Sequence, residues 1–238
     1  MPESTPIAAS RDERFDDACQ LWAGRFQAVI ATHSLADPGY PFASAVPYCL
    51  DACGNPLLLL SHLAQHTKNL SADARCGLSV VQATEGDVQQ SLRLGCTADC
   101  QEVNPADAAS HRRWFRYYPS SRRYFEQLNF RLYRLIPRRF HVNGGFGTAR
   151  WLDSTRILRV SPFDEAQELA LIQTAQGVSD AVWPDPADRP TADPIRIVGV
   201  DPWGLDLARG DALRRVPLPE PITDLDHLRL ALLARTVG

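Results

Sequence analysis

The sole lysine of the chain stands in a segment whose side chains could bind a phosphate group. Residues 61–69 combine hydroxyl, amide and cationic side chains at a point where a strand is expected to give way to a helix. Backbone N–H groups at the start of a helix, together with Ser61, Thr67 and Lys68, suit a phosphate. The spacing alone leaves open a plainer alternative, an exposed loop that happens to carry a lysine.

A second set of residues is cationic and interleaved with aromatic side chains. Residues 111–160 carry 12 arginines against two acidic side chains, whereas residues 1–110 and 161–238 are both net acidic. This distribution predicts an anionic partner such as a small carboxylate or phosphate ligand, although pairing with the acidic flanks explains it equally well. The sequence pI of about 6.1 argues against nucleic acid. The arginines considered are Arg112, Arg113, Arg116, Arg122, Arg123, Arg131, Arg134, Arg138 and Arg139.

The remaining motifs mainly exclude classes of function. The glycines at 144, 145 and 147 do not form the dinucleotide-binding pattern, so they predict a tight loop or a close approach of a ligand or chain. Six cysteines lack the spacing of common zinc sites and are expected to be buried or half-buried free thiols, and no metal site is predicted. No hydrolase motif is present, so catalytic residues stay unassigned.

Length and composition bound the fold. The chain has 238 residues, of which 45% are hydrophobic and 22% charged, values that exclude wholesale disorder. No run of about 18 apolar residues would span a membrane, and the N-terminus lacks the pattern of a secretory signal. We therefore expect a cytoplasmic protein with no membrane partner.

The positioning elements predict an α+β protein with two domains. Strands are expected at residues 26–32, 42–50, 57–61, 76–82, 90–103, 130–136 and 140–142, separated by turns and a few helices. Asn104 is expected to cap the helix that precedes the arginine-rich region. Short strands with tight turns favour an antiparallel barrel over residues 1–155. Residues 156–238 then form a small α/β unit, whose first helix follows Asp164 and places Leu169, Ile172 and Ala175 on one face.

Several segments together resemble a known family. They are residues 41–48 (PFASAVPY) with the following turn and residues 57–70, then FRLYRLIP at 130–137, GGFGTARW at 144–151 and VGVDPWGLDL at 198–207. In these stretches the chain resembles the pyridoxamine 5′-phosphate oxidase-like FMN-binding split barrels. More narrowly, it resembles their haem-utilisation, HugZ-like branch with its small C-terminal domain.

The resemblance implies an antiparallel split β-barrel that forms a homodimer with two FMN sites at the subunit interface. The implied cofactor-binding residues are Ser44, Val46, Ser61, Thr67, Lys68 and Asn69. Of these, Lys68 and Thr67 would hold the phosphate, and Ser61 would meet the ribityl chain or the phosphate. Ser44 and Val46 would lie beside the isoalloxazine ring.

We therefore expect an FMN-dependent oxidoreductase that acts on an unidentified small molecule. One alternative is a haem-binding or haem-degrading protein, whose arginine-rich region would receive the haem propionates. Another is an interaction module that has kept the fold without a cofactor. Binding of FMN, of haem, or of neither would discriminate the three.

Overall fold

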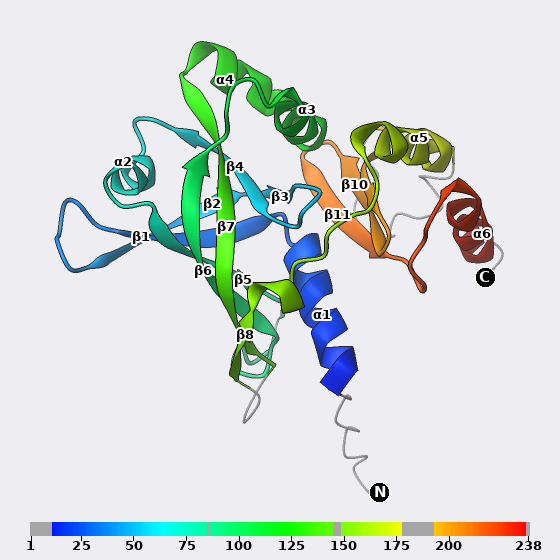
Figure 1. Ribbon diagram of the computed structural model, residues 1–238, viewed down its shortest axis with the longest axis horizontal. Coiled ribbons are helices and arrows are strands. Elements are labelled where there is room, and N and C mark those ends of the chain that lie inside the picture. The colour runs from blue at the N-terminus through cyan, green and yellow to red at the C-terminus, as the bar shows by residue number, and fades with distance from the viewer. Residues whose placement is uncertain (1–10, 85, 145–148, 178–192, 237–238) are drawn as a thin grey trace, which may run out of the picture.

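The computed structural model describes residues 11–84, 86–144, 149–177 and 193–236, and it contains two antiparallel sheets (Figure 1). The larger sheet curls into a split barrel, with strand order β2-β1-β5-β6-β7-β4-β3 and with β8 paired to β7. Its strands are β1 (Gln27–His33), β2 (Pro41–Pro47), β3 (Cys49–Leu50), β4 (Pro56–Ser61), β5 (Arg75–Val81), β6 (Arg93–Glu102), β7 (Phe130–Asn143) and β8 (Arg150–Asp153). This confirms the expected α+β fold class.

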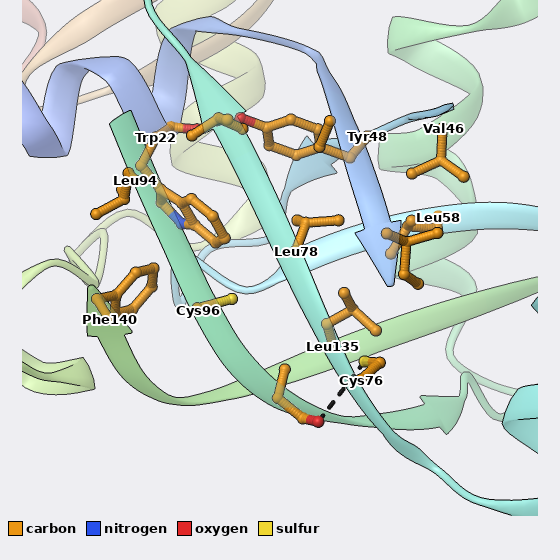
Figure 2. Close-up of a cluster of buried hydrophobic side chains, with 14 of the residues drawn as sticks. Trp22, Val46, Tyr48, Leu58, Cys76, Leu78, Leu94, Cys96, Leu135 and Phe140 are labelled. Carbon is orange, nitrogen blue, oxygen red and sulfur yellow. Dashed lines mark hydrogen bonds between the residues drawn. The ribbon is translucent and has the colours of Figure 1, made fainter. Parts of the chain in front are cut away.

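The barrel closes around an aromatic and aliphatic core (Figure 2). Trp22 meets Phe140 edge-on, with ring centroids 4.9 Å apart. The polar atoms of the core are satisfied locally, since the Trp22 indole N–H donates to the carbonyl of Gly54 at 3.0 Å and the Tyr48 hydroxyl donates to the carbonyl of Trp22 at 2.6 Å. These bonds allow large amphipathic rings to be buried without unpaired donors.

Two strand boundaries differ from the expectation. The single strand expected over residues 42–50 is divided at Tyr48, so β2 pairs with β1 and only the short β3 pairs with β4. The two strands expected at 130–136 and 140–142 are one continuous strand, β7. Pro137 cannot donate to a ladder, and it is accommodated because the pairing register with β6 shifts between Thr97 and Ala98.

Within the described part of residues 1–157, the helices that accompany the barrel are α1 (Arg11–Gly24), α2 (Gln65–Ala72), α3 (Ala108–Tyr117) and α4 (Arg122–Gln127), with a 3₁₀ turn η1 (Pro119–Ser121) before α4. The expected cap of α3 was wrong. Asp107 rather than Asn104 is the N-cap, and its carboxylate accepts the N–H of Ser110 at 3.1 Å. The Asn104 side chain instead accepts the N–H of Ala106, forming a separate turn.

The second sheet has strand order β11-β10-β9 and lies beside α5 and α6, to the right of the barrel in Figure 1. The elements that follow β8 are η2 (Ser154–Arg156), α5 (Glu165–Gln176), β9 (Arg196–Asp201), β10 (Gly204–Arg209), β11 (Ala212–Pro217) and α6 (Leu225–Thr236). Asp164 and Gln167 form a reciprocal capping box at the start of α5. Ile172 and Ala175 of α5 are buried as expected, but the expectation was wrong for Leu169, which is exposed while Leu171 packs in the core.

Among the described residues, no helix is long and apolar enough to cross a membrane.

Candidate functional site

The segment predicted to bind a phosphate joins β4 to α2. Ser61 ends β4 opposite Phe130, and its hydroxyl oxygen accepts the N–H of Leu63 at 3.2 Å. Lys68 is exposed on α2. No described residue forms an ion pair with Lys68, so its ammonium group is free to meet an anion.

Thr67 and Asn69 point the other way, toward the barrel. The Asn69 side chain is fully buried. Its amide oxygen accepts a hydrogen bond from the Leu35 N–H at 3.1 Å, and its amide nitrogen donates one to the Thr32 hydroxyl at 2.9 Å. These bonds tie α2 to β1 and occupy the amide. Thr67 is also buried, and its hydroxyl oxygen has no hydrogen-bond partner within the described ranges.

Ser44 and Val46 lie on β2 with their side chains on the inner side of the sheet. Ser44 is half-buried opposite Ile30, and Val46 is buried opposite Ala28 within the barrel core. The chemistry of this donor set fits a phosphate only in part. Lys68 and the Ser61 hydroxyl are accessible, whereas the Asn69 amide is engaged elsewhere.

The arginine-rich region is divided between internal ion pairs and the surface. Arg113 and Arg116 of α3 both contact the buried carboxylate of Glu168 on α5, at 2.7 and 2.9 Å. Arg134 pairs with Asp51 at 2.8 Å and with Asp107 at 3.2 Å. For these three arginines, pairing with the acidic flanks accounts for the charge pattern, and they are not available to an external anion.

A different feature of the barrel has the form of a ligand site. Two hollows of about 490 and 410 Å³ share Ala31, Gly77 and Thr97, and together they form one trough across β1, β5, β6 and β7. Both volumes lie within the range of small-molecule sites. The trough exists because alternate positions of these strands point away from the core and are small, namely Ala31, Gly77, Ser79, Gly95 and Thr97.

One end of the trough is polar. His33, the last residue of β1, lies there beside the ion pairs Arg75–Asp73 and Arg138–Asp99. His33 Nε2 is 4.0 Å from Asp73 Oδ2, and the His33 side chain is 63% exposed. Hydrogen bonds from Arg75 hold the pKa of Asp73 well below its usual range, so this carboxylate is ionised at neutral pH.

The other end is aromatic. The His141 ring on β7 lies 5.1 Å from the Trp151 ring on β8, and the Arg139 guanidinium lies 5.3 Å from the centre of the same indole. Trp151 is 50% exposed. Across the described ranges, no carboxylate forms an ion pair with Arg139. This end therefore offers an exposed indole, an imidazole and the Arg139 guanidinium, which lies opposite Asp153 in the ladder but forms no ion pair with it.

Sequence reasoning missed the trough because its residues come from strands that are far apart in the chain. The rows Val29–Ser79–Gly95–His141–Trp151 and Ala31–Gly77–Thr97–Arg139–Asp153 become neighbours only through strand pairing. The available signal was the run of small residues at outward positions of successive strands. Of the glycine-rich loop considered above, Gly144 is exposed and residues 145–148 lie outside the described residues.

The six cysteines are free thiols, and five of them are buried. The expectation was wrong for Cys53, which is exposed because it lies in the turn between β3 and β4. Within the described part of the chain, no group of three His, Cys, Asp or Glu side chains is placed to hold a metal ion.

Comparison with known proteins places this architecture among established folds. A family model described as the CREG β-barrel matches residues 11–157. The non-canonical haem oxygenase HOZ of Arabidopsis thaliana chloroplasts is 35% identical over 89 residues, which are 37% of this chain and 27% of that protein. The chain thus spans about a quarter of the length of this relative.

Two solved structures share the fold over nearly the whole chain. One is a protein of unknown function from Agrobacterium tumefaciens, 22% identical, with a TM-score of 0.70 and coverage of 98% of this chain and 99% of that one. The other is a haem-binding protein from Mycobacterium smegmatis, 23% identical, with a TM-score of 0.56 and coverage of 97% and 98%. At these identities the likeness establishes the fold and no more.

Proposed function

The chain belongs to the CREG β-barrel family, and from this premise we propose that it is a haem-binding protein of the haem-utilisation, HugZ-like branch, with haem held in the trough. The observation that carries the proposal is a floor of small side chains with a histidine at each end. The distance from β1 to β7 is about 14 Å at the usual strand spacing. A flat, largely apolar ring needs such an area free of protruding side chains.

The charges around the trough suit the two propionates of haem. Arg139 lies at its aromatic end without an ion-pair partner among the described residues, and a guanidinium can bind a carboxylate through two parallel hydrogen bonds. Arg75 and Arg138 lie at the polar end but are already paired with aspartates. Arg139 is therefore the arginine that could bind a propionate without breaking an existing ion pair.

The relatives support haem as the ligand class. The matched Arabidopsis protein is a haem oxygenase, and the Mycobacterium smegmatis protein of the same fold binds haem. When bound, haem would supply an iron centre for oxygen or electron-transfer chemistry. The residues of this chain would hold the ring flat, exclude water from one of its faces and neutralise its carboxylates.

We also propose that the protein is a homodimer in which a second copy covers the trough. A ring lying on the floor has its other face open, whereas small-molecule sites bury 70–90% of the ligand surface. Val29 and Trp151 are both about half exposed at the trough and would be covered by a partner. Light scattering with and without haem measures this directly, and a monomer under both conditions would contradict it.

A second candidate function is an FMN-dependent oxidoreductase acting on a small molecule. It is favoured by one specific observation, the exposed Lys68, with which no described residue forms an ion pair, on the segment that also presents the accessible Ser61 hydroxyl. A phosphate would supply acceptors for both groups. The Lys68→Ala variant should then bind FMN much more weakly than the wild type, and unchanged affinity would remove the support from this candidate.

One experiment separates the candidates. Purified protein is titrated with haem, followed by its Soret band, and in parallel with FMN, followed by fluorescence quenching. Saturable binding of one haem per chain, which is two per homodimer, supports the proposal. Saturable quenching of FMN alone supports the oxidoreductase instead. Binding of neither ligand means that the barrel serves as a scaffold without a cofactor.

A further inference from the structure

We infer that the hydroxyls of Thr97 and Ser79 form a binding site for a small ligand of the haem iron, on the side of the ring that faces the trough floor. The inference rests on the haem binding proposed above and adds to it a site for a hydrogen-bond acceptor of one or two atoms. It follows from the place of Thr97 in the trough, from two glycines beside the hydroxyls, and from what the neighbouring side chains already contact.

Thr97 lies at the middle of the trough. The two hollows share Ala31, Gly77 and Thr97, so a ring that spans both hollows is centred over these residues. Of the three, Thr97 alone has a polar side chain, and that side chain is exposed. Because the iron stands at the centre of a haem ring, Thr97 is placed to meet what the metal binds on this side.

Ser79 stands diagonally across from Thr97 on the neighbouring strand. In the antiparallel ladder of β5 and β6, Gly77 pairs with Thr97 and Ser79 pairs with Gly95. All four alternate with buried residues and face away from the core. Diagonal neighbours of this kind have Cβ atoms about 7 Å apart. Two hydroxyls at that spacing can both donate to one small acceptor between them, since hydroxyl hydrogen bonds are about 2.7 Å long.

The two glycines leave room for such a ligand. A Cβ atom added to Gly95 would meet only the Leu78 carbonyl oxygen, at 3.9 Å, and one added to Gly77 would come closest to the Cys96 carbonyl oxygen, at 3.3 Å. These neighbours belong to the sheet itself, so the space above the glycines is open toward the trough. A ring that rests on the two hydroxyl-bearing side chains therefore spans a recess above the glycines.

Both hydroxyls are available, whereas the neighbouring reactive side chains stand elsewhere. Across the part of the chain that the structure describes, neither hydroxyl forms a hydrogen bond, and both side chains are exposed. His33 and Tyr40 line the polar end of the trough, and the His141 ring packs against Trp151 at the aromatic end. Cys76 is buried, and its thiol is directed to a backbone carbonyl of β6. The hydroxyl pair is therefore the polar feature of the central floor.

The test uses fluoride, an acceptor that cannot donate, with the ferric haem complex, and follows the shift of the Soret and charge-transfer bands. We expect Thr97→Val, which keeps the shape but removes the donor, to raise the Kd for fluoride at least about tenfold, the effect of one hydrogen bond to a charged acceptor. Ser79→Ala should weaken fluoride binding in the same direction. Thr97→Ser retains the hydroxyl and should match the wild type. Thr155→Val, the same substitution at an exposed position of η2 outside both hollows, should also match it.

Metal-free protoporphyrin separates this role from packing against the ring. It has the outline and the propionates of haem but binds no ligand at its centre. Thr97→Val should therefore bind metal-free protoporphyrin as tightly as the wild type does.

The outcomes distinguish this inference from the proposal on which it rests. If the wild-type haem complex binds no fluoride, or if Thr97→Val keeps the wild-type Kd for fluoride, the inference is overturned while haem binding stands. If Thr97→Val also loses affinity for metal-free protoporphyrin, Thr97 only packs against the ring and the inference is wrong. If the wild type shows no saturable Soret change with haem, haem binding itself fails and the inference fails with it.

Discussion

The hydroxyl of Tyr117 on α3 donates a 2.6 Å hydrogen bond to the carboxylate of Asp206 on β10. Both side chains are buried, and the Asp206 carboxylate also contacts Arg215 at 2.8 Å. Burial raises the pKa of Asp206, against the opposing effect of Arg215. The bond joins a helix of the barrel to the second sheet, and it adds a second donor to a carboxylate that Arg215 of β11 already binds.

Replacing Tyr117 with Phe should therefore destabilise the whole chain. The substitution removes a donor from a buried carboxylate, which typically costs about 1.5–3 kcal/mol. The free energy of unfolding in urea measures the effect. Tyr40→Phe is the control, because Tyr40 is 71% exposed and its hydroxyl has no such role. Equal stabilities for the two variants would show that the Tyr117 bond does not contribute.

The buried pairing of Arg113 and Arg116 with Glu168 predicts a larger effect. Glu168→Ala leaves two guanidinium groups buried without their shared carboxylate, and breaking a buried ion pair in this way costs about 3–5 kcal/mol. Glu165 lies on the same helix and pairs with the exposed Arg112. Glu165→Ala should change the unfolding midpoint only slightly, because exposed ion pairs contribute little. Similar losses in both variants would contradict this account.

Asp107 predicts a specific dependence of stability on pH. Burial opposes its ionisation, but the N–H and hydroxyl of Ser110 and the Arg134 guanidinium hold the pKa of Asp107 below its ordinary value. A depressed native pKa stabilises the protein above the unfolded-state pKa, near 4, and this stabilisation is lost as the pH falls through the native value. Asp107→Asn keeps an N-cap but removes the charge.

Unfolding midpoints should therefore fall more steeply for the wild type than for Asp107→Asn between pH 6 and pH 3. Parallel pH profiles would show that Asp107 is not coupled to folding.

The cysteines predict a single reactive thiol. Burial raises the pKa of Cys49, Cys76, Cys96 and Cys100 to about 12, and that of Cys19 also rises, whereas Cys53 is exposed in a turn. Because the thiolate is the reactive form, Ellman's reagent at pH 8 should titrate one thiol per folded chain quickly and six after denaturation. Cys53→Ser should abolish the fast phase; a persisting fast phase would place a second thiol at the surface.

Local chemistry made much of the fold predictable. Asp164 with Gln167 marks the start of α5, and the Asp51 turn with Gly54 separates β3 from β4, because caps and turns depend on a few adjacent residues. The two strand boundaries that differ from the prediction are set by the pairing between strands. The division of the strand at Tyr48 and the passage of β7 through Pro137 depend on which strands lie alongside, which the local sequence does not encode.

The site was less predictable for the same reason. Lys68 could be singled out because it is the only lysine, and its exposure agrees with a binding role. The buried amide of Asn69, by contrast, is committed to Thr32 on another element. His33 and His141 are 108 positions apart and share a trough only because β1, β5, β6 and β7 pair in this order.

The central claim is that haem lies on the floor of the trough, and filling that floor tests it most directly. Gly95 tolerates a side chain, since an added Cβ would meet only the Leu78 carbonyl oxygen, at 3.9 Å. The measurement is a Soret titration of Gly95→Trp beside Gln173→Trp, which adds the same indole at an exposed position of α5. We expect Gly95→Trp to raise the Kd for haem at least about tenfold, or about 1.4 kcal/mol, and Gln173→Trp to match the wild type. Wild-type affinity in Gly95→Trp would contradict the claim.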